Sequence, residues 1–584
     1  MRRTKIVCTI GPACEEITTL RAMIAAGMDI ARLNFSHGSH LEHGKRIEMI
    51  REAARLENKI VGIMLDTKGP EIRTGSLPDG KKTLHPGETV QLIQGTKGTT
   101  EAIAIDYPYL VEDVKPGDTF FIDDGKLNLC VEAVLGEALS CRVVVGGELK
   151  ERKGVNIPGV SVRLPALTDR DIDDLRFGCS QGVDFIAASF IRKPSDVLDI
   201  RRILEEEDSD AHIIAKIEHS DAVNNLEGII AVANGIMVAR GDLGVELPTE
   251  EVPLVQKQII QLCNRVGCPV ITATQMLESM VGNPRPTRAE ASDVANAIFD
   301  GTDATMLSGE TAAGAYPVEA VATMAKLAKR TDAARQAAPQ QRTFPPDLAI
   351  TISDAISFAT CQAAQVLAAA AIITPTEAGS TARTVAKYRP RVPIVAASPN
   401  QRALRKLALV WGVTPVLVDR TDNTDTLIEQ AVQAGLEAGI IREGDMTLIT
   451  AGVPFGVPGT TNLMKVHIVS EVLCNGQGVG RGHAQGKVRF VRDTADIAKV
   501  CPGDVIFTLG LDEGLAAAAA KAVGIVAVEG GLTSAASIAA LTYGIPAVVG
   551  VDEALDVVRE DEIVTIDAAR GIIYRGLVNL GKSS

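Results

Sequence analysis

Short apolar runs alternate with helix-like segments along much of this chain, and this alternation limits the folds that the chain can adopt. Three runs come before residue 69, KIVCTIGP, DIARLNFS and VGIMLDTK, and five come after residue 183, DFIAASF, HIIAKIE, GIMVARGD, PVITATQ and DATMLSGE. Such alternation is typical of βα units with parallel strands. Eight units of this kind predict a closed (β/α)8 TIM barrel within an α/β protein.

The alternation is interrupted between about Gly69 and Pro165. Turn signals crowd this stretch, LPDG, HPGE, KPGD, DDGK and IPGV among them, and short alternating segments such as 119–122 lie between the turns. This pattern predicts a small all-β domain. Because the stretch follows the third apolar run, we expect a β-barrel lid that is inserted into the TIM barrel.

The rest of the chain indicates two further domains. A polar, proline-bearing segment at 341–346 is typical of a linker, and new βα units follow it in AIITPT, VPIVAAS, TPVLVD and MTLITAG. After Cys474, a glycine-rich run, NGQGVGRGHAQG, opens a last segment with several β-like runs. The expected domains are the TIM barrel over 1–69 and 167–341, the lid over 70–166, an α/β regulatory domain over 342–472 and an appended β/β/α swivelling-type domain over 473–584.

Composition excludes several classes of protein. The 584 residues include 59 Lys and Arg against 73 Asp and Glu, and the formal net charge of −14 opposes binding to nucleic acid. The longest uncharged stretch, 355–376, reads as a helix followed by a strand, so no membrane partner is expected. The N-terminus leads into a strand instead of a signal peptide, and ten scattered cysteines without a CxxC pair indicate neither zinc nor disulfides. We therefore expect a cytoplasmic protein.

Polar and charged residues gather where the eight strands are expected to end. In TIM barrels, catalytic groups come from the C-terminal ends of the strands. Any one such residue is typically exposed to water without a function, but so many on one rim indicate an active site. In the second unit, Arg32, Asn34 and Ser36 are spaced i, i+2, i+4 and should point the same way. The other candidates are Asp66 and Thr67 in the third unit, Lys216 and Glu218 in the fifth, Arg240 and Asp242 in the sixth, Thr274 in the seventh, and Ser308 and Glu310 in the eighth.

Lys216 and Glu218 lie two residues apart in an otherwise apolar strand, so both project the same way. A buried structural ion pair is one interpretation. Asp242 at the next strand end favours another, because Mg²⁺ takes one or two carboxylates and completes its shell with water and substrate oxygens. Arg32, Arg73 and Lys216 add cations for an anionic substrate, and Asp242 follows a glycine that allows close backbone approach. The set indicates phosphoryl transfer.

Seven longer motifs follow one another along about the first 470 residues. They are ARLNFSHG (31–38), LDTKGPEIRTG (65–75), KIE (216–218), MVARGDLGVE (237–246), TATQMLESM (272–280), PTRAEASDVANA (286–297) and MLSGET (306–311). Together they resemble the pyruvate kinases, which also carry a lid after the third strand. The resemblance implies transfer of the phosphoryl group of phosphoenolpyruvate to ADP in glycolysis, giving ATP and pyruvate. It also implies Mg²⁺ or Mn²⁺ and K⁺ as cofactors, and a homotetramer.

The resemblance further implies a role for individual residues. Lys216 is expected to stabilise the transferring phosphoryl group, Arg32 to contact the phosphate, and Gly241, Asp242 and Thr274 to contact the carboxylate or the enolate. The expected metal ligands are Glu218 and Asp242 for Mg²⁺ and Asn34, Ser36, Asp66 and Thr67 for K⁺, with Glu71 as the acidic residue that accompanies potassium dependence. The expected nucleotide-binding residues are Asn34, His37, Arg73 and, from the lid, Lys153. His219 stands where the family commonly has Asn, and we expect it to tune activity.

A loop of Gly, Ser and Thr, TEAGSTA (376–382), follows the AIITP run and suits a phosphate group if it begins a helix. An ordinary helix cap is the alternative. The loop is placed like the effector loop of pyruvate kinases, which implies a sugar-phosphate or AMP activator at Thr376, Ser380 and Thr381, with Arg383 as a further contact. Such an activator would have to favour one state of an oligomer.

The last segment contains GGLTSAASIAALTYGIPAVVG (530–550), which resembles the phosphohistidine domain of phosphoenolpyruvate-utilising synthases and dikinases. Those domains have His directly after Thr-Ser, whereas this chain has Ala535. Alanine offers no nucleophile, so the sequence does not support covalent transfer of phosphate through this domain. We expect the appended domain to be structural or regulatory.

Two other functions stay open on the sequence. The last segment favours a phosphoenolpyruvate synthase or dikinase-type phosphotransferase, although Ala535 and the complete set of barrel residues argue against it. A non-catalytic effector-binding protein on the same fold is the second, although Lys216, Glu218, Asp242 and Thr274 are all present. Formation of AMP would identify the first, and failure to form pyruvate the second.

Overall fold

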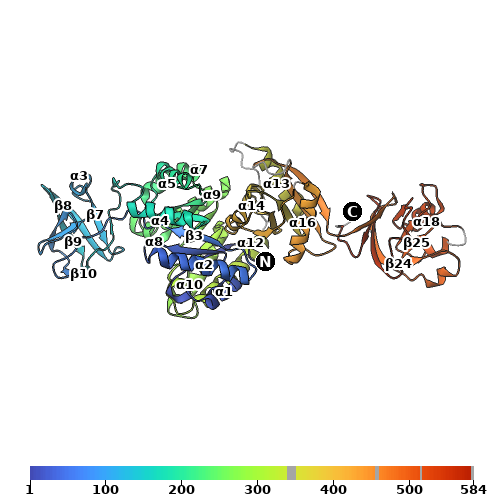
Figure 1. Cartoon of the computed structure of the whole chain (residues 1–584), viewed down its shortest axis with the longest axis horizontal. Coiled ribbons are helices and arrows are strands. Elements are labelled where there is room, and N and C mark those ends of the chain that lie inside the picture. The colour runs from blue at the N-terminus through green and yellow to red at the C-terminus, as the bar shows by residue number, and fades with distance from the viewer. Residues whose placement is uncertain (338–349, 422, 454–458, 513–515, 581–584) are drawn as a thin grey trace. The chain divides into compact units, whose positions relative to one another are not determined.

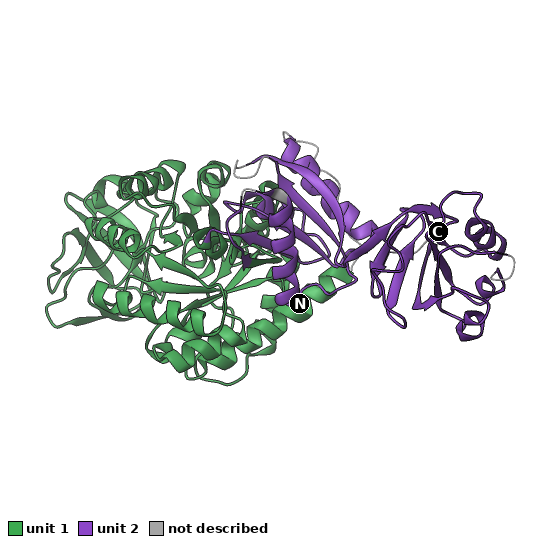
Figure 2. Cartoon of the chain, turned by 45° about the vertical axis from the view of Figure 1, so that its right-hand side comes forward, with its two compact units in different colours: residues 1–346, 401–415 green, residues 347–400, 416–584 purple. Residues whose placement is uncertain are grey.

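The computed structural model describes residues 1–337, 350–421, 423–453, 459–512 and 516–580 (Figure 1). The chain divides into two compact units, of which unit 1 comprises 1–346 with 401–415 and unit 2 comprises 347–400 with 416–584 (Figure 2). The linker expected at 341–346 lies outside the described residues. No helix within the described ranges has both the length and the apolar character that a membrane span requires.

Unit 1 is built around a closed barrel of eight strands, and neighbouring strands pair in parallel all the way round. The eight apolar runs form these strands, so the predicted TIM barrel is confirmed. In barrel order after β1, the neighbours are β16, β15, β14, β13, β12, β3 and β2. The strands are β1 (Lys5–Thr9), β2 (Ile30–Asn34), β3 (Gly62–Asp66), β12 (Phe185–Ala188), β13 (His212–Ile217), β14 (Gly235–Ala239), β15 (Val270–Ala273) and β16 (Ala304–Leu307).

Amphipathic helices surround the strands, which are therefore buried on both faces. Every residue of β1, β3 and β14 is buried. In the helix at Pro194–Glu206, Val197, Ile200 and Leu204 lie on the buried face while Leu198 is exposed, as a 3.6-residue period requires. The helices are η1 (Pro12–Cys14), α1 (Ile17–Ala26), α2 (His40–Leu56), α4 (Asp169–Ser180), α5 (Pro194–Glu206), α6 (Ser220–Asn224), α7 (Leu226–Val232), α8 (Arg240–Glu246), α9 (Val252–Val266), η2 (Glu278–Val281), α10 (Arg288–Asp300), α11 (Gly309–Ala312) and α12 (Pro317–Ala337).

A segment from far along the chain completes the barrel unit at the N-terminal ends of its strands. Residues 401–415, which begin with α15 (Gln401–Leu407), belong to unit 1. Arg405 Nε lies 2.7 Å from Asp184 Oδ1, at the start of β12, and Lys5 Nζ donates to the carbonyl of Val413 at 2.6 Å. Leu409 is buried in one hydrophobic cluster with side chains of the barrel strands. Because this end is covered, the C-terminal ends of the strands are the ones open to form a site.

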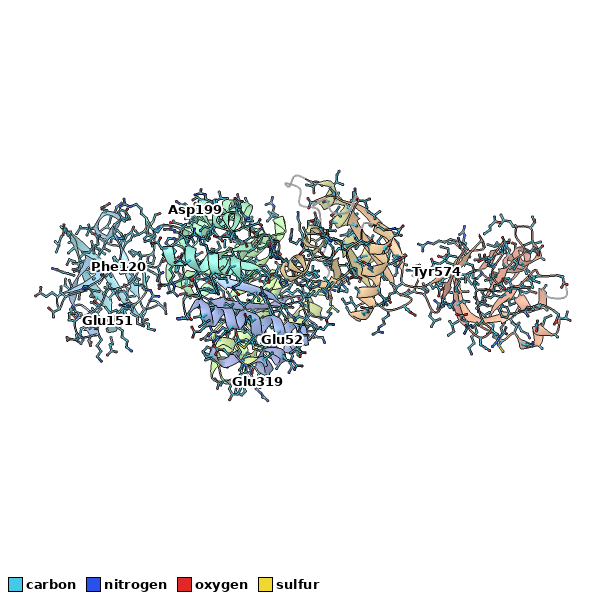
Figure 3. The ribbon with its side chains drawn as sticks, viewed as in Figure 1. Glu52, Phe120, Glu151, Asp199, Glu319 and Tyr574 are labelled. Atoms are coloured by element: carbon cyan, nitrogen blue, oxygen red, sulfur yellow. The ribbon has the colours of Figure 1, made fainter. Side chains whose placement is uncertain are left out.

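The insert after β3 has its own core. Its strands form a six-stranded sheet and a two-stranded ribbon, and Phe120, labelled in Figure 3, is fully buried among them. The β-rich insert expected from the turn signals is therefore present. Its elements are β4 (Lys81–Leu84), β5 (Thr89–Gln94), β6 (Ala102–Ile105), α3 (Leu110–Asp113), β7 (Thr119–Ile122), β8 (Leu127–Leu135), β9 (Ala138–Val145), β10 (Gly147–Lys150) and β11 (Val155–Asn156).

Unit 2 contains a five-stranded and an eight-stranded sheet. The uncharged stretch at 355–376 forms most of a helix and the next strand, as its sequence predicts. Around the first sheet lie α13 (Ile352–Val366), β17 (Ala371–Pro375), α14 (Ser380–Lys387), β18 (Ile394–Ser398), β19 (Val413–Leu417), α16 (Thr424–Glu437), β20 (Met446–Gly452) and β21 (Thr461–Ile468). The second comprises β22 (Val472–Asn475), β23 (Gln477–Val479), β24 (His483–Phe490), β25 (Val505–Thr508), β26 (Gly524–Ala527), β27 (Ala547–Val549), β28 (Ile563–Asp567) and β29 (Ile572–Arg575), with η3 (Asp496–Lys499), α17 (Ala516–Ala519) and α18 (Ala535–Tyr543).

The contacts of 401–415 with the barrel predict that Leu409→Ala destabilises unit 1. Removing this buried side chain should lower the free energy of unfolding by about 2–5 kcal/mol, because the cavity cannot collapse fully. Denaturant unfolding followed by the fluorescence of Trp411, the only tryptophan in the sequence, measures the effect. Leu254→Ala is the matched control, since the Leu254 side chain is 59% exposed on α9. Equal midpoints for the two variants would contradict this placement of the segment.

Candidate active site

Asp66, the last residue of β3, lies between two cations at the C-terminal rim of the barrel. Its Oδ2 is 2.6 Å from Arg32 Nε on the neighbouring β2, and its Oδ1 is 3.2 Å from Lys216 Nζ on β13. Burial by itself raises the pKa of Asp66, but the charges of Arg32 and Lys216 outweigh burial and hold that pKa below its usual value. Three strands therefore bring one carboxylate and two cations together in fixed positions.

The Lys216 ammonium has three side-chain partners at the rim. Its Nζ lies 2.8 Å from Glu218 Oε1 and donates to Ser189 Oγ at 2.7 Å. Burial by itself lowers the pKa of Lys216, but Asp66 and Glu218 more than compensate and raise that pKa. Lys216 and Glu218 both face residues of the rim, so they lie inside the barrel mouth and not against an outer helix. The lysine is therefore a fixed and permanently charged cation.

Ser189 is a residue that the sequence did not single out. It directly follows β12, and besides accepting from Lys216 it donates to the carbonyl of Thr67 at 2.6 Å. Its own N–H donates to Thr67 Oγ1 at 3.1 Å. The available signal was its position at the end of the fourth apolar run. A serine at a strand end is so common that the signal has little weight without the structure.

Glu218 and Asp242 form a pair of neighbouring carboxylates. Glu218 Oε2 accepts from the N–H of Phe190 at 2.7 Å, whereas in the described part of the chain no hydrogen bond or ion pair reaches the Asp242 carboxylate. Burial and, secondly, the charge of Glu218 raise the pKa of Asp242 to about 7. Two carboxylates that repel each other at a partly buried rim have the donor chemistry of a divalent cation site. No cluster of three or more His, Cys, Asp or Glu suited to a metal occurs among the described residues, so the rest of a metal shell would come from water or substrate.

Thr274 stands in a strained loop between β15 and η2. Its φ is +65° and that of Gln275 is +54°, a left-handed conformation that costs non-glycine residues on the order of 1–3 kcal/mol each. The Thr274 hydroxyl accepts from the N–H of Gly241 at 2.8 Å and donates to the carbonyl of Ala273 at 2.7 Å. The strained backbone therefore carries a hydroxyl that is fixed beside the first turn of α8. The same turn carries Asp242.

Polar oxygens gather at the ends of β2 and β3. Asn34 pairs with Asp66 in the strand register, and Asn34 Oδ1 accepts from the N–H of Ser36 at 3.1 Å. Thr67 follows β3 directly, and its hydroxyl accepts from the N–H of Ser189. The expected i, i+2, i+4 alignment of Arg32, Asn34 and Ser36 is wrong, because β2 ends at Asn34 and Ser36 lies in the following turn.

The expected nucleotide-binding residues Arg73 and Lys153 have their ion-pair partners within the insert. Arg73 Nε is 2.8 Å from Glu71 Oε2, and Lys153 Nζ is 2.8 Å from Asp123 Oδ1. Within the described ranges, neither has a hydrogen bond or ion pair with the rim residues above. His37 is exposed in the turn after β2. In this structure these cations are therefore paired locally and not with the rim.

Several other strand-end candidates support the backbone. Glu310 accepts from the N–H groups of Leu277, at 3.0 Å, and of Ser308, at 2.6 Å, and burial raises the pKa of Glu310. His219 turns away from the carboxylate pair, because its Nδ1 accepts from the N–H of Asp221 and its Nε2 lies 3.4 Å from Glu246 Oε2. The side chains of Glu310 and His219 are therefore both engaged by other groups of the protein.

Comparison with known proteins agrees with this architecture. The chain matches the pyruvate kinase barrel domain over residues 1–321 and the pyruvate kinase alpha/beta domain over 354–467. A pyruvate kinase of Geobacillus stearothermophilus is 51% identical over 581 residues, which cover 98% of this chain and 99% of that protein. The chain belongs to the pyruvate kinase family. Pyruvate kinases are phosphotransferases that convert phosphoenolpyruvate to pyruvate in glycolysis, so the predicted family and enzyme class are confirmed.

Further relatives extend the pyruvate kinase assignment to the appended domain. A pyruvate kinase of Staphylococcus epidermidis is 49% identical and covers 99% of this chain and all of that protein. A pyruvate kinase structure from Cryptosporidium parvum is 39% identical, with a TM-score of 0.76 over 80% of this chain and 96% of that one. Residues 500–571 match the mobile domain of PEP-utilising enzymes. Because the bacterial pyruvate kinases align over nearly the full chain, this match does not require a synthase or dikinase.

Pyruvate kinases are generally metal-dependent, and the raised pKa of Asp242 predicts how a metal would respond to pH. A divalent cation held by Glu218 and Asp242 would compete with protons, because the pKa of Asp242 is raised to about 7. The affinity for Mg²⁺ should therefore fall by about tenfold per pH unit well below that value, with proton release on binding. Calorimetric titration of Mg²⁺ at pH 6, 7 and 8 measures both. An affinity that is equal at the three pH values would contradict the assignment, and Asp242→Asn is the control.

Proposed function

We propose that this chain transfers the phosphoryl group of phosphoenolpyruvate to ADP, giving ATP and pyruvate, with Lys216 as the cation that stabilises the group in transit. One observation supports this most directly: Lys216 keeps its charge in a buried position and lies 2.8 Å from Glu218, beside Asp242 and Arg32. Phosphoryl transfer needs little covalent chemistry from a protein, so fixed positive charge accounts for most of the catalysis.

The substrate would lie against both sides of the rim. Arg32 contacts the phosphate, and the backbone of Gly241 and Asp242 together with Thr274 contacts the carboxylate or the enolate that forms when the phosphoryl group leaves. The geometry is consistent with one substrate reaching both residues, because Gly241 and Thr274 are adjacent at the start of α8, where the Gly241 N–H donates to the Thr274 hydroxyl at 2.8 Å. The enolate must gain a proton at carbon to become pyruvate, and a fixed hydroxyl orients the group that donates it.

The carboxylates of Glu218 and Asp242 would hold Mg²⁺ or Mn²⁺. When bound, such an ion neutralises the charge of phosphate oxygens and orients them. A K⁺ ion would be held by the oxygens of Asn34, Ser36, Asp66 and Thr67, because K⁺ prefers carbonyl, hydroxyl and carboxylate ligands. Glu71 would be the acidic residue that accompanies potassium dependence. Asn34 and Asp66 pair at the ends of β2 and β3, and Ser36 and Thr67 follow them in the chain.

The nucleotide would contact Asn34, His37, Arg73 and Lys153. Arg73 and Lys153 come from the start and the end of the insert, so an ADP phosphate that binds them would exchange the local partners Glu71 and Asp123 for its own oxygens. Phosphate oxygens accept charge-assisted hydrogen bonds from arginine and lysine as carboxylates do. The insert would then act as a lid over the nucleotide.

The role of Lys216 predicts that Lys216→Met lowers kcat by about 10²–10³-fold while phosphoenolpyruvate still binds, because the cation acts mainly on the transition state. A coupled assay for pyruvate measures kcat, and calorimetry measures binding of phosphoenolpyruvate. Lys5→Met is the matched control, since Lys5 is equally buried, at 9% exposure, at the other end of the barrel. Turnover of Lys216→Met close to that of the unaltered chain would refute the role.

The protein would act as a cytoplasmic homotetramer. Unit 2 offers one surface for self-association, because β21 is an edge strand of the five-stranded sheet in the described residues. Met464 and Val466 on this strand are 41% and 37% exposed. Unpaired edges with apolar side chains are typical of strands that pair with another chain.

An activator that carries phosphate would bind the loop at Thr376, Ser380 and Thr381. The helix α14 begins at Ser380 behind Gly379, whose φ is +82°, and no side chain caps this helix end. Burial lowers the pKa of Arg383, and within the described residues this arginine has no carboxylate partner. A buried arginine without a carboxylate partner, beside backbone N–H groups that no side chain caps, suits the phosphate of a sugar phosphate or AMP.

This proposed site predicts that an activator shifts the saturation curve for phosphoenolpyruvate to lower concentrations. Sugar monophosphates, sugar bisphosphates and AMP are tested singly, and Arg383→Gln should abolish the shift without changing the curve measured in the absence of activator. Arg442→Gln is the control, because Arg442 is an exposed arginine of unit 2 that lies before β20 and outside this loop. If none of the compounds moves the curve, the loop has only a structural role.

A further inference from the structure

We propose that Arg240 is a positioning residue for the reaction, which holds the loop at 274–277 so that the Thr274 hydroxyl faces the site. This inference rests on the role proposed above for Thr274. Arg240 begins α8 and follows β14, and the sequence alone placed it among the polar and charged residues at the strand ends. In the structure, the partners of Arg240 are backbone carbonyls and a carboxylate of the protein itself.

The guanidinium of Arg240 binds three successive backbone carbonyls. Its Nε donates to the carbonyl of Ala273 at 3.2 Å, and its Nη2 donates to those of Thr274, at 2.8 Å, and Gln275, at 3.5 Å. Its Nη1 lies 2.7 Å from the carboxylate of Asp293 on α10. All three nitrogens therefore donate to protein acceptors, so this arginine is not available as a cation for substrate. The planar fork of donors is specific to arginine.

The loop needs this support because of its backbone conformation. Thr274 and Gln275 both have positive φ, which is rare for residues other than glycine and rarest for a β-branched one. Strain of this kind persists only where the surrounding structure fixes it. Arg240 fixes it directly, since its partners are the carbonyls of the two strained residues.

The neighbouring residues of Arg240 tie the loop to the metal-binding pair. The N–H of Gly241 donates to the Thr274 hydroxyl at 2.8 Å, and Asp242 comes next in the chain. Arg240 and Gly241 thus hold Thr274 by its carbonyl and by its hydroxyl at the same time. A loop that relaxed away from Arg240 would carry the hydroxyl away from Asp242, and displacements near 1 Å are enough to reduce catalysis.

The test is a double-mutant cycle with Arg240→Lys and Thr274→Val in the full chain. Lysine keeps the charge but has one donor centre, so Arg240→Lys should lower kcat about 10–100-fold. The KM for phosphoenolpyruvate should stay within about threefold, because substrate contacts are retained. In the Thr274→Val background the same change should lower kcat by less than about twofold, because the hydroxyl that Arg240 positions is already absent.

The matched control is Arg2→Lys. Arg2 also donates to two carbonyls, those of Thr4 and Gly27, and pairs with Asp29 at 2.6 Å, but it lies before β1 at the opposite end of the barrel. Arg2→Lys should lower the melting temperature and leave kcat unchanged in both backgrounds. If Arg240→Lys does not fold, Arg240→Gln takes its place in the cycle, since its amide retains a planar donor.

The outcomes separate this inference from the proposed function. A low kcat for both single variants with no further loss in the double variant supports the positioning role. Losses that multiply in the double variant, or a kcat for Arg240→Lys equal to that for Arg2→Lys, overturn the inference and leave the role of Thr274 intact. Unchanged turnover in Thr274→Val overturns the proposed role of Thr274 and the inference with it.

Discussion

The buried carboxylate of Asp66 is the group on which the rest of the rim depends. Its side chain is 1% exposed and lies between Arg32 and Lys216, both of which are also largely buried. Removing Asp66 would leave the largely buried Arg32 without its carboxylate partner, a loss of several kcal/mol, whereas Lys216 would keep Glu218. Because Asp66 offsets both positive charges, a chain with a net charge of −14 keeps two cations at one rim, where they would face an anionic substrate.

The opposite arrangement lies directly beside this set, since Glu218 also pairs with Lys216 at 2.8 Å. Asp242 and Glu218 are like charges brought together, and Thr274 is held with a positive φ. Both features are unfavourable in isolation, and both persist because rigid neighbours impose them. The paired strands β13 and β14 hold the two carboxylates together, and the first turn of α8 holds the loop. The barrel therefore keeps an electrostatic repulsion and a strained backbone at positions where a bound cation or a reacting substrate would relieve them.

The barrel and most of its rim could be predicted from the sequence because both follow local rules. Apolar runs predict strands, and polar residues at their ends, such as Lys216 and Asp242, predict a site. Ser189 escaped notice because its identity has meaning only once Lys216 is seen to donate to it. Ser36 was misplaced because spacing cannot reveal that β2 ends two residues earlier. The packing of 401–415 on the barrel, the domain boundaries and the partners of Arg240 depend on long-range contacts that local patterns do not contain.

The position of residues 401–415 in unit 1 also has a consequence for folding during synthesis. The chain passes between the two units three times, and the hydrophobic cluster that contains Leu409 and barrel residues needs both parts of unit 1. Domains usually fold in order as they leave the ribosome. Here the barrel cannot bury its N-terminal end until more than 60 residues beyond position 346 have emerged, so part of unit 2 is made before unit 1 is complete. A nascent chain halted before residue 401 would expose an apolar surface at the base of the barrel, where a chaperone could bind.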